Sequence, residues 1–349
     1  MKKTILTKNE EKVLYGLIKY PGINDSELSQ KIKVKLSTLT SIKRKLEKNG
    51  FFRILIVPLL NRLDCELLAV IYTQFNPVIP LEDRIQTTKR TIEVFDEIFF
   101  STGEQEKGFS LSLSKNYTNI GRINEIRTET FGQLGLLEKE YPNEVIFPFE
   151  TSKIFRFFDF ERILKKFFSI EDTKKEANIR WFEKTDQINL SAKEKKVLIA
   201  LIENPNLPTQ KIGEKIKLSR HTIARMKKQF FEKGLIRQIV LPELNKLGFE
   251  ILAFYHIKFN PYKPPKIEDI NFLDSYYSIF LAQRKFETVI ISAYPNFQEF
   301  HEDKMNKIRF LKENDLVSFS PLIETYSFEK MIVIKDFDFV PITKKILNV

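Results

Sequence analysis

The chain of 349 residues repeats itself once, and this repeat limits what it can fold into. Residues 6–77 align with residues 190–261 without a gap, and about 25 of roughly 72 aligned positions are identical. The matches include EEKVLYGLI beside EKKVLIALI, and ELLAVIYTQFNP beside EILAFYHIKFNP. We interpret the chain as a tandem duplication of one unit of about 175 to 185 residues. Any fold that accounts for one copy must therefore be built twice.

Each copy begins with the pattern of a helix-turn-helix. In the second copy Ser219 is a typical N-cap, because its hydroxyl can accept a hydrogen bond from a free backbone N–H. Ile223, Met226 and Phe230 then recur on one face of a helix, and Gly234 suits a left-handed helix end. A β-rich run follows the glycine. This order predicts a reading helix that leads into the strand of a wing.

The polar side of this helix is basic. It carries Arg220, His221, Arg225 and Lys228, opposite the apolar stripe. A short helix with one apolar and one basic side suits the major groove of DNA, although a solvated surface helix can show the same pattern.

The helix of the first copy presents a weaker set of base partners, so the two copies are not expected to read the same base sequence. Arg53 and Arg237 occupy matched positions at the start of each wing, where an arginine can reach a phosphate or simply lie on the strand surface. The predicted DNA-binding residues are Ser37, Thr38, Thr40, Ser41, Lys43, Arg44, Lys45 and Arg53 in the first copy, and Ser219, Arg220, His221, Thr222, Arg225, Lys227, Lys228 and Arg237 in the second.

The net charge is concentrated in the two helix-turn-helix segments. Residues 1–62 hold 14 Lys and Arg against 5 Asp and Glu, a net charge of +9, and residues 189–247 hold 13 against 5, a net charge of +8. The whole chain carries +11, so the remaining segments together carry −6. A charge that served solubility would be spread out, whereas a surface for phosphates is localised. Double-stranded DNA is therefore the predicted partner.

An α+β segment of the order β-α-β-β-α-β follows each winged helix, which is the ferredoxin-like arrangement. The fold class predicted is α+β, with two copies of a winged helix-turn-helix plus a ferredoxin-like domain. The predicted domains are residues 1–62 and 63–168 in the first copy, a linker at 169–188, and residues 189–247 and 248–349 in the second. Later strands are expected at residues 153–158 and 331–334.

Each copy resembles the Lrp/AsnC, or feast/famine, family of transcription regulators. The likeness rests on LSRHTIARMKKQFFEKGLIRQIVLPELNKLGFEILAF, above all on the Gly-Leu-Ile-Arg turn and on the Leu-Gly before a strand. The resemblance implies an N-terminal winged helix and a C-terminal ferredoxin-like domain for effector binding and oligomerisation. Because members of the family dimerise, the two halves are expected to form an intramolecular pseudo-dimer, and further homo-oligomers stay open.

The resemblance also indicates where an effector would bind. The family places a Thr-Gly turn after the second strand of the sheet, lining its small-molecule site. The first copy keeps Thr102 and Gly103, which are the candidate effector-binding residues, whereas the second copy has Ala282 and Gln283. No ligand is named by these residues, so the existence of a small-molecule effector stays open.

The sequence shows no pattern of a known catalytic or metal site. Its three histidines are not spaced as metal ligands, and no HExxH, GxSxG or P-loop pattern occurs. We therefore expect no enzyme activity, no cofactor and no metal. The lone Cys65 excludes an intrachain disulfide, and no apolar run approaches the ~20 residues of a membrane span, so a cytoplasmic protein without membrane contact is expected.

The function predicted from the sequence is a sequence-specific DNA-binding transcription regulator whose two heads read two unequal half-sites. Two alternatives stay open. One is an enzyme of the Lrp-like fold, of the haem-pathway decarboxylase type, and the other is a winged-helix module that binds protein.

Overall fold

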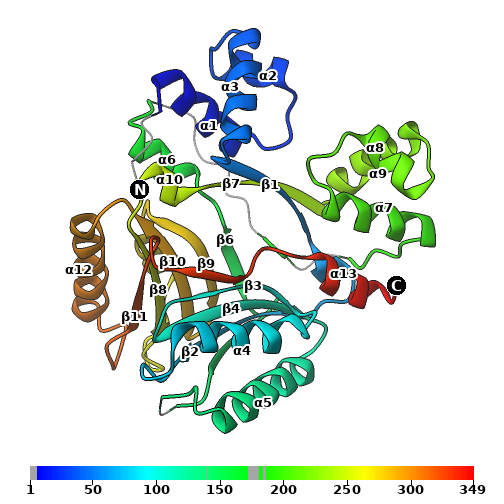
Figure 1. Cartoon of the computed structure of the whole chain (residues 1–349). Coiled ribbons are helices and arrows are strands. Elements are labelled where there is room, and N and C mark those ends of the chain that lie inside the picture. The colour runs from blue at the N-terminus through cyan, green and yellow to red at the C-terminus, as the bar shows by residue number, and fades with distance from the viewer. Residues whose placement is uncertain (1–5, 139, 172–180, 184–185) are drawn as a thin grey trace. The chain divides into compact units, whose positions relative to one another are not determined.

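The computed structural model describes residues 6–138, 140–171, 181–183 and 186–349. Most of the linker predicted at residues 169–188 lies outside the described residues. Along the chain the same order of helices and strands occurs twice (Figure 1). None of the helices in the described ranges is long and apolar enough to cross a membrane.

Three helices and a strand form each head, as predicted. The first head contains α1 (Lys8–Lys19), α2 (Asp25–Lys31), α3 (Leu36–Lys48) and β1 (Phe52–Pro58), followed by the short η1 (Leu60–Arg62). The second contains α7 (Ala192–Glu203), α8 (Thr209–Ile216), α9 (Arg220–Glu232), β7 (Ile236–Pro242) and α10 (Leu244–Leu247). Capping boxes at Thr7 and Ser191 begin α1 and α7, and the hydroxyl of Ser219 caps α9.

Two five-stranded sheets carry the ferredoxin-like order, which confirms the predicted fold class. The first half supplies β2 (Leu67–Gln74), α4 (Leu81–Glu93), β3 (Ile98–Gly103), β4 (Lys107–Ser114), α5 (Tyr117–Gln133) and β5 (Asn143–Pro148). The second half supplies β8 (Ile251–Lys258), α11 (Ile267–Leu273), β9 (Ser278–Arg284), β10 (Glu287–Tyr294), α12 (Phe297–Glu313) and β11 (Leu322–Ser327).

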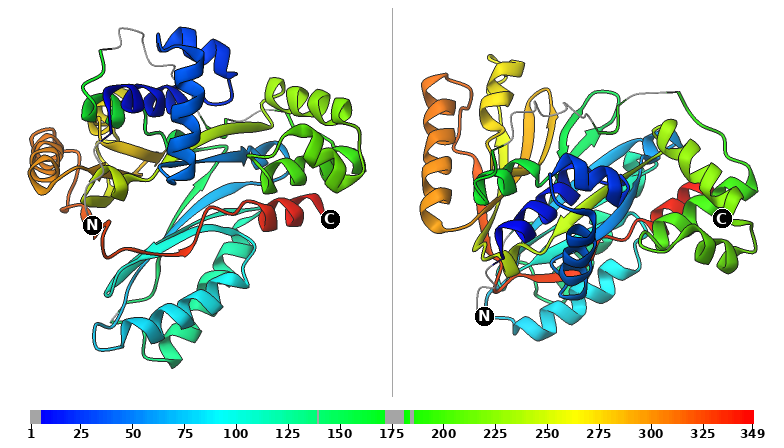
Figure 2. Two further views of the ribbon diagram at one scale, coloured as in Figure 1. Left: turned by 45° about the horizontal axis from the view of Figure 1, so that its top comes forward. Right: turned by 90° about the horizontal axis from the view of Figure 1, so that it is seen from above.

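The fifth strand of each sheet comes from the other half of the chain. The strand β6 (Lys153–Phe157) joins the sheet of the second half, in the order β11-β8-β10-β9-β6. The strand β12 (Ile332–Lys335) joins the sheet of the first half, in the order β12-β3-β4-β2-β5. The tail helices α6 (Glu161–Phe167) and α13 (Val340–Leu347) follow these strands. In the views of Figure 2, α13 lies beside α7, where Lys195 donates a hydrogen bond to the carbonyl of Leu347 at 2.7 Å.

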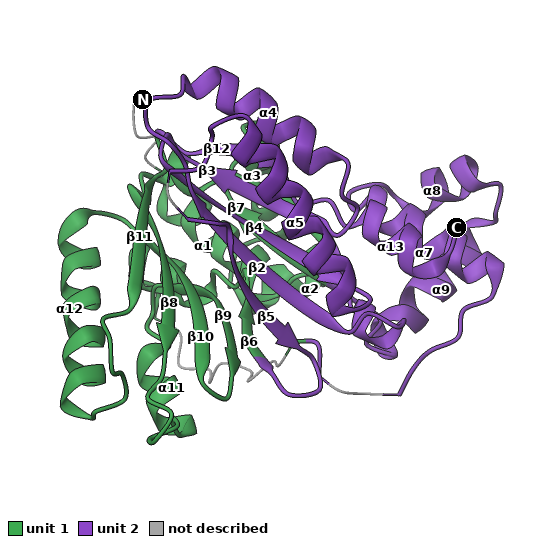
Figure 3. Cartoon of the chain, turned by 90° about the horizontal axis from the view of Figure 1, so that it is seen from below, with its two compact units in different colours: residues 1–55, 154–181, 238–329 green, residues 56–153, 182–237, 330–349 purple. Residues whose placement is uncertain are grey.

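The chain forms two compact units that do not follow the predicted domain boundaries (Figure 3). Unit 1 contains residues 1–55, 154–181 and 238–329, and unit 2 contains residues 56–153, 182–237 and 330–349. Each unit therefore combines the head of one half with the sheet of the other.

The strands β1 and β7 explain this division, because they pair with each other and each runs through a boundary of the units. Within unit 1 the amide of Glu243 donates to the carbonyl of Phe51 at 2.8 Å. Within unit 2 the amide of Leu59 donates to the carbonyl of Leu235 at 2.8 Å.

Candidate functional site

Most of the predicted DNA-binding residues lie on accessible surfaces of the heads, and their contact with DNA stays a prediction. Those that are exposed are Ser37, Ser41, Arg44, Lys45, Arg53, Ser219, Arg220, His221, Arg225 and Lys228. Those that are partly buried are Thr38, Thr40, Lys43, Thr222, Lys227 and Arg237.

Several cations of the heads are already engaged within the protein. Lys43 pairs with Asp25 and Lys45 pairs with Glu10, each at 2.6 Å. Burial lowers the pKa of Lys227. A cation that already has a partner, or that is partly desolvated, gains less from a phosphate. Lys43, Lys45 and Lys227 are therefore less available to a phosphate than fully solvated lysines.

The candidate effector turn lies in unit 2 at the end of β3, beside β12, the strand that the second half adds to this sheet. Thr102 is buried, and its hydroxyl donates to the carbonyl of Ile332 at 3.0 Å. Gly103 pairs with Ile332 in the sheet, and a Cβ atom added at Gly103 would lie 2.7 Å from the carbonyl oxygen of Lys107. The close approach of β4 therefore explains the glycine, and a role of this turn in effector binding stays a prediction.

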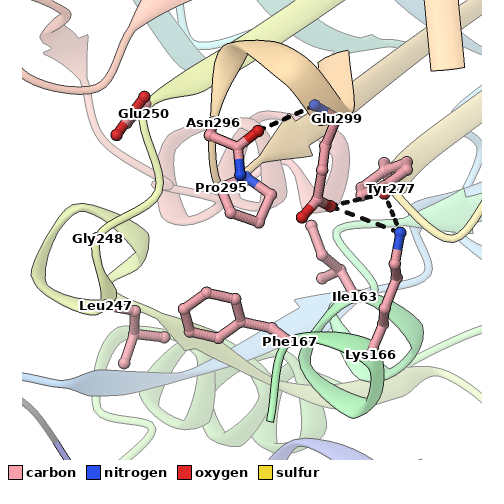
Figure 4. Close-up of a pocket in the computed structure, with 10 residues that line it drawn as sticks. All are labelled: Ile163, Lys166, Phe167, Leu247, Gly248, Glu250, Tyr277, Pro295, Asn296 and Glu299. Atoms are coloured by element: carbon pink, nitrogen blue, oxygen red, sulfur yellow. Dashed lines mark hydrogen bonds and ion pairs between the residues drawn. The ribbon is translucent and has the colours of Figure 1, made fainter. Parts of the chain in front are cut away.

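A cavity of about 320 Å³ opens in unit 1, which the sequence did not indicate (Figure 4). Its walls come from α6, from the end of α10 and the residues after it, from the start of β9, and from the first turn of α12. The residues that line it are Ile163, Lys166, Phe167, Leu247, Gly248, Glu250, Tyr277, Pro295, Asn296 and Glu299.

Three polar side chains meet at this cavity, namely those of Lys166, Tyr277 and Glu299. The phenol of Tyr277 donates a hydrogen bond to Oε2 of Glu299 at 2.6 Å. The ammonium of Lys166 donates to the phenol oxygen, lies 3.5 Å from the same carboxylate oxygen, and sits 4.2 Å from the centre of the phenol ring. In Figure 4 all three point toward one another at one side of the cavity.

The local structure explains how these groups are held. The side chain of Asn296 accepts a hydrogen bond from the amide of Glu299 at 2.9 Å, which caps α12 and fixes its first turn. The buried Ile163 anchors α6, and Lys19 pairs with Glu161 at 2.6 Å to hold this helix against α1. The three polar groups are therefore presented by elements that are themselves fixed.

The phenol of Tyr277 stays protonated over a wide range of pH. Burial, followed by the hydrogen bond to Glu299, raises the pKa of Tyr277 well above its usual value. The neighbouring ammonium of Lys166 would stabilise the phenolate once the proton has left. The three groups can thus donate a proton and stabilise the resulting charge.

A second, fully buried network lies behind Tyr277. Its ring is 4.7 Å from that of Tyr294, centre to centre, and the hydroxyl of Tyr294 donates to Asp303 at 2.6 Å. The hydroxyls of Tyr255 and Tyr294 lie 2.9 Å apart, and Lys307 forms an ion pair with Asp303. Burial raises the pKa of Tyr294 and of Tyr255. This network supports the wall of the cavity with polar groups that satisfy one another.

Sequence reasoning missed this site because its residues are far apart along the chain. Only one signal pointed toward it, since the tails DFERILKKFF and DFVPITKKIL match and place Lys166 beside Lys345. In unit 2, Lys345 pairs with Glu97 at 2.8 Å. Glu97 comes just before β3, as Tyr277 comes just before β9. The partner of the tail lysine is therefore a glutamate in unit 2 and a tyrosine in unit 1.

No protein-family model and no curated protein sequence matches the chain. Among solved structures, the siroheme decarboxylase NirDL matches over the whole length, with 11% sequence identity and a TM-score of 0.52, covering 97% of this chain and 99% of that chain. This chain shares its fold with an enzyme. A structure of NirDL in complex with an iron-uroporphyrin III analogue matches with 12% identity and a TM-score of 0.51, covering 98% and 99% of the two chains.

Regulators of the AsnC family match a smaller part of the chain. AsnC from E. coli covers 40% of this chain and 92% of its own length, with 16% identity and a TM-score of 0.31. A transcriptional regulator from Neisseria meningitidis, in complex with L-Met, covers 40% and 90%, with 17% identity and a TM-score of 0.33.

The expectation that the chain is not an enzyme is wrong, because the structures that match it along its whole length are those of a decarboxylase. That expectation rested on the spacing of the histidines. In the structure His221 lies on α9, His256 lies 3.8 Å from Glu287, and His301 stacks on Phe297 at 6.0 Å. None of the three lines the cavity, whose polar groups are a lysine, a tyrosine and carboxylates instead.

Proposed function

We propose that this protein is an enzyme that decarboxylates a carboxylate side arm of an iron tetrapyrrole of the siroheme class. The observation that carries the proposal is the meeting of Lys166, Tyr277 and Glu299 at the cavity of unit 1. The similarity to NirDL along the whole chain supports it, since a structure of that protein contains an iron-uroporphyrin III analogue.

The size of the cavity suits one arm of such a substrate. Small-molecule sites commonly enclose roughly 300–1,000 Å³, and this cavity of about 320 Å³ is at the lower end of that range. A peripheral arm can enter it while the macrocycle stays outside. The apolar wall formed by Ile163, Phe167 and Leu247 excludes water from part of the cavity and strengthens the interactions of the charged groups.

The reaction then follows from the positions of the three groups. The bond between the carboxyl carbon and the neighbouring methylene carbon breaks, carbon dioxide leaves, and the electron pair remains on the methylene carbon next to the ring. Tyr277 donates its proton to that carbon, which becomes a methyl group. Lys166 stabilises the phenolate, and Glu299 orients the phenol before transfer. No electrons are exchanged with an outside reductant or oxidant.

The test is an assay of siroheme conversion by the full chain, followed by mass spectrometry for the loss of carbon dioxide. Tyr277→Phe and Lys166→Met should each lower the rate by about 10²-fold or more, the range of a lost acid–base group. The matched control is Lys345→Met, which removes the corresponding lysine of unit 2 and should leave the rate close to that of the unaltered chain. Absence of any conversion by the unaltered chain, or full rates in both cavity variants, would refute the proposal.

DNA binding by the heads is a second candidate, favoured by the exposure of Arg220 and Arg225 and by the charge of the heads. If each head neutralises three to four phosphates, the slope of log affinity against log salt should be about −5 to −7. Arg225→Ala should cost about 1–3 kcal/mol of binding free energy if the side chain contacts a base edge. The matched change Ser41→Ala should cost less. An affinity that does not change with salt concentration would exclude this candidate. Equal losses in the two variants would instead contradict the inequality of the two heads.

A further inference from the structure

Two arginines are buried in unit 2 between the sheet and its helices. Arg84 on α4 is 1% exposed and Arg127 on α5 is 2% exposed. Both helices cover the same face of the sheet (Figure 1), where Ile92 and Ile123 pack on Ile71 of β2. Two positive charges therefore lie in the buried layer between the sheet and its helices.

Neither guanidinium has an acidic partner among the described residues. Arg84 donates to the carbonyl of Glu104, and Arg127 donates to the hydroxyl of Ser110 at 3.0 Å. A guanidinium offers five N–H donors, and the Nε of each arginine has no partner within the described part of the chain. Burial lowers the pKa of both side chains to about 10, so both remain charged at neutral pH.

Further polar groups in the same layer also lack partners. The hydroxyls of Thr73, Thr88 and Ser112 are buried and unsatisfied within the described ranges. Thr88 lies one helical turn after Arg84 on α4. On β4, Ser112 and Ser110 are two residues apart and face the helices, and Thr73 lies on the same face of β2 as Ile71. Unsatisfied donors of this kind therefore converge from α4, α5, β2 and β4.

Each of the two guanidiniums contacts an aromatic ring in this layer. The guanidinium carbon of Arg84 lies 4.5 Å from the ring centre of Phe75, and the guanidinium carbon of Arg127 lies 5.7 Å from the ring centre of Phe131. The two rings contact edge to face at 5.8 Å. Both charges thus flank one small aromatic cluster.

In the other half of the chain, the buried cation at the corresponding position is neutralised by a carboxylate. Asn116 and Asn296 cap α5 and α12, and counting from these caps places Lys307 at the position of Arg127. Lys307 is buried as well, but Asp303, four residues earlier, forms an ion pair with it. In α5 the position four residues earlier is Ile123. Unit 2 thus has a buried cation, Arg127, but lacks the carboxylate that serves as its counter-ion in unit 1.

An uncompensated buried charge is costly, since each ion loses its hydration and several kcal/mol remain even after relaxation. A buried guanidinium whose Nε lacks a partner in the ranges that the structure describes is a site for an anion. We propose that unit 2 binds a small monovalent anion, chloride, at Arg127 as its missing counter-ion. Because Arg127 is almost fully buried, a small anion suits this position better than a large one. This site is independent of the cavity in unit 1.

The first measurement is thermal unfolding of the full chain in sodium chloride and in sodium gluconate at equal ionic strength. A ligand that binds the folded state raises its stability with concentration, and we expect a rise in Tm of about 2 °C in chloride. Crystals grown in sodium bromide should show an anomalous peak within hydrogen-bonding reach of Arg127. Equal Tm values in the two salts, together with no bromide peak in this layer, would overturn the proposal.

The second measurement uses variants that alter the counter-ion. Ile123→Asp places a carboxylate where α12 has Asp303, so the difference in Tm between chloride and gluconate should vanish. Arg127→Met should reduce that difference as well, and Arg122→Met, on the exposed side of the same helix, should leave it unchanged. If Arg127→Met fails to fold, Ile123→Asp still decides. A chloride effect that persists in a folded Ile123→Asp variant would place the anion elsewhere and refute the assignment.

Discussion

The buried ion pair of unit 1 yields a stability prediction whose size follows from the structure. Asp303 accepts hydrogen bonds from Tyr294 at 2.6 Å and from Ser275 at 3.2 Å, and it forms an ion pair with Lys307, whose side chain is 3% exposed. Asp303→Asn removes the charge but keeps the shape of the side chain, so an ammonium is left buried without its counter-ion. Breaking one partner of a buried pair typically costs about 3–5 kcal/mol, and we expect a loss of this size.

The measurement is urea unfolding of the full chain, followed by tryptophan fluorescence. The only tryptophan, Trp181, belongs to unit 1, where its ring lies 5.2 Å from that of Phe157. Its emission therefore reports on the unit that carries the pair. The control is Glu302→Gln, a change at an exposed neighbour on the same helix, which should alter stability by no more than about 0.5 kcal/mol.

A double-mutant cycle decides whether the pair itself is responsible. Lys307→Met leaves a buried carboxylate and should also be costly, whereas the combination with Asp303→Asn removes both charges. The combined loss should fall short of the sum of the single losses by about 0.5–3 kcal/mol, as for residues in direct contact. Additive losses, or a loss below about 1 kcal/mol for Asp303→Asn, would show that the two charges do not depend on each other.

Three further predictions concern the helices. Hydrogen bonds from Lys45 and from the N-cap lower the pKa of Glu10, so the stability it contributes is present above the usual pKa of 4.5 and is lost as pH falls through the lower folded value. Glu10→Gln should lower the free energy of unfolding by about 1 kcal/mol at neutral pH. In a titration followed by circular dichroism, the stability of this variant should fall less steeply at acid pH than that of the unaltered chain. Gly213→Ala would drive its Cβ into the carbonyl oxygen of Leu218 and should cost about 1–3 kcal/mol in thermal melts. Gly121→Ala, with nothing within 4 Å of the new atom, should instead stabilise α5 by up to about 1 kcal/mol, and a loss there would contradict the helix-propensity argument.

Local patterns in the sequence were sufficient to predict the heads and the order of elements in the sheets. The N-cap at Ser219 and the apolar stripe after it form α9, and the alternating FSLSLS forms β4. These features depend on neighbours within a few residues, which a sequence displays directly. The strands expected at residues 153–158 and 331–334 also form, as Lys153–Phe157 and Ile332–Lys335. Their pairing with the sheet of the other half was not expected.

The candidate site was beyond sequence reasoning for the same reason. Lys166 and Tyr277 are more than a hundred residues apart and meet only because the tail of the first half joins the second sheet. No spacing rule connects a lysine, a tyrosine and a glutamate across such a distance. The search for catalytic patterns relied on the spacing of histidines and on short motifs, which are local signals, and it therefore led to the wrong conclusion about enzyme activity.

The exchange of β6 and β12 has a consequence for how the protein is made. Domains commonly fold one after another as they leave the ribosome, but neither unit here is complete when the first half has emerged. The head at residues 1–55 lacks the rest of its unit until residues 238–329 have been synthesised, and the edge of β3 stays uncovered until residues 330–349 have been synthesised. An uncovered strand edge can pair with another chain. Termination before β12 would therefore yield a product with an open edge at β3 that is prone to aggregate.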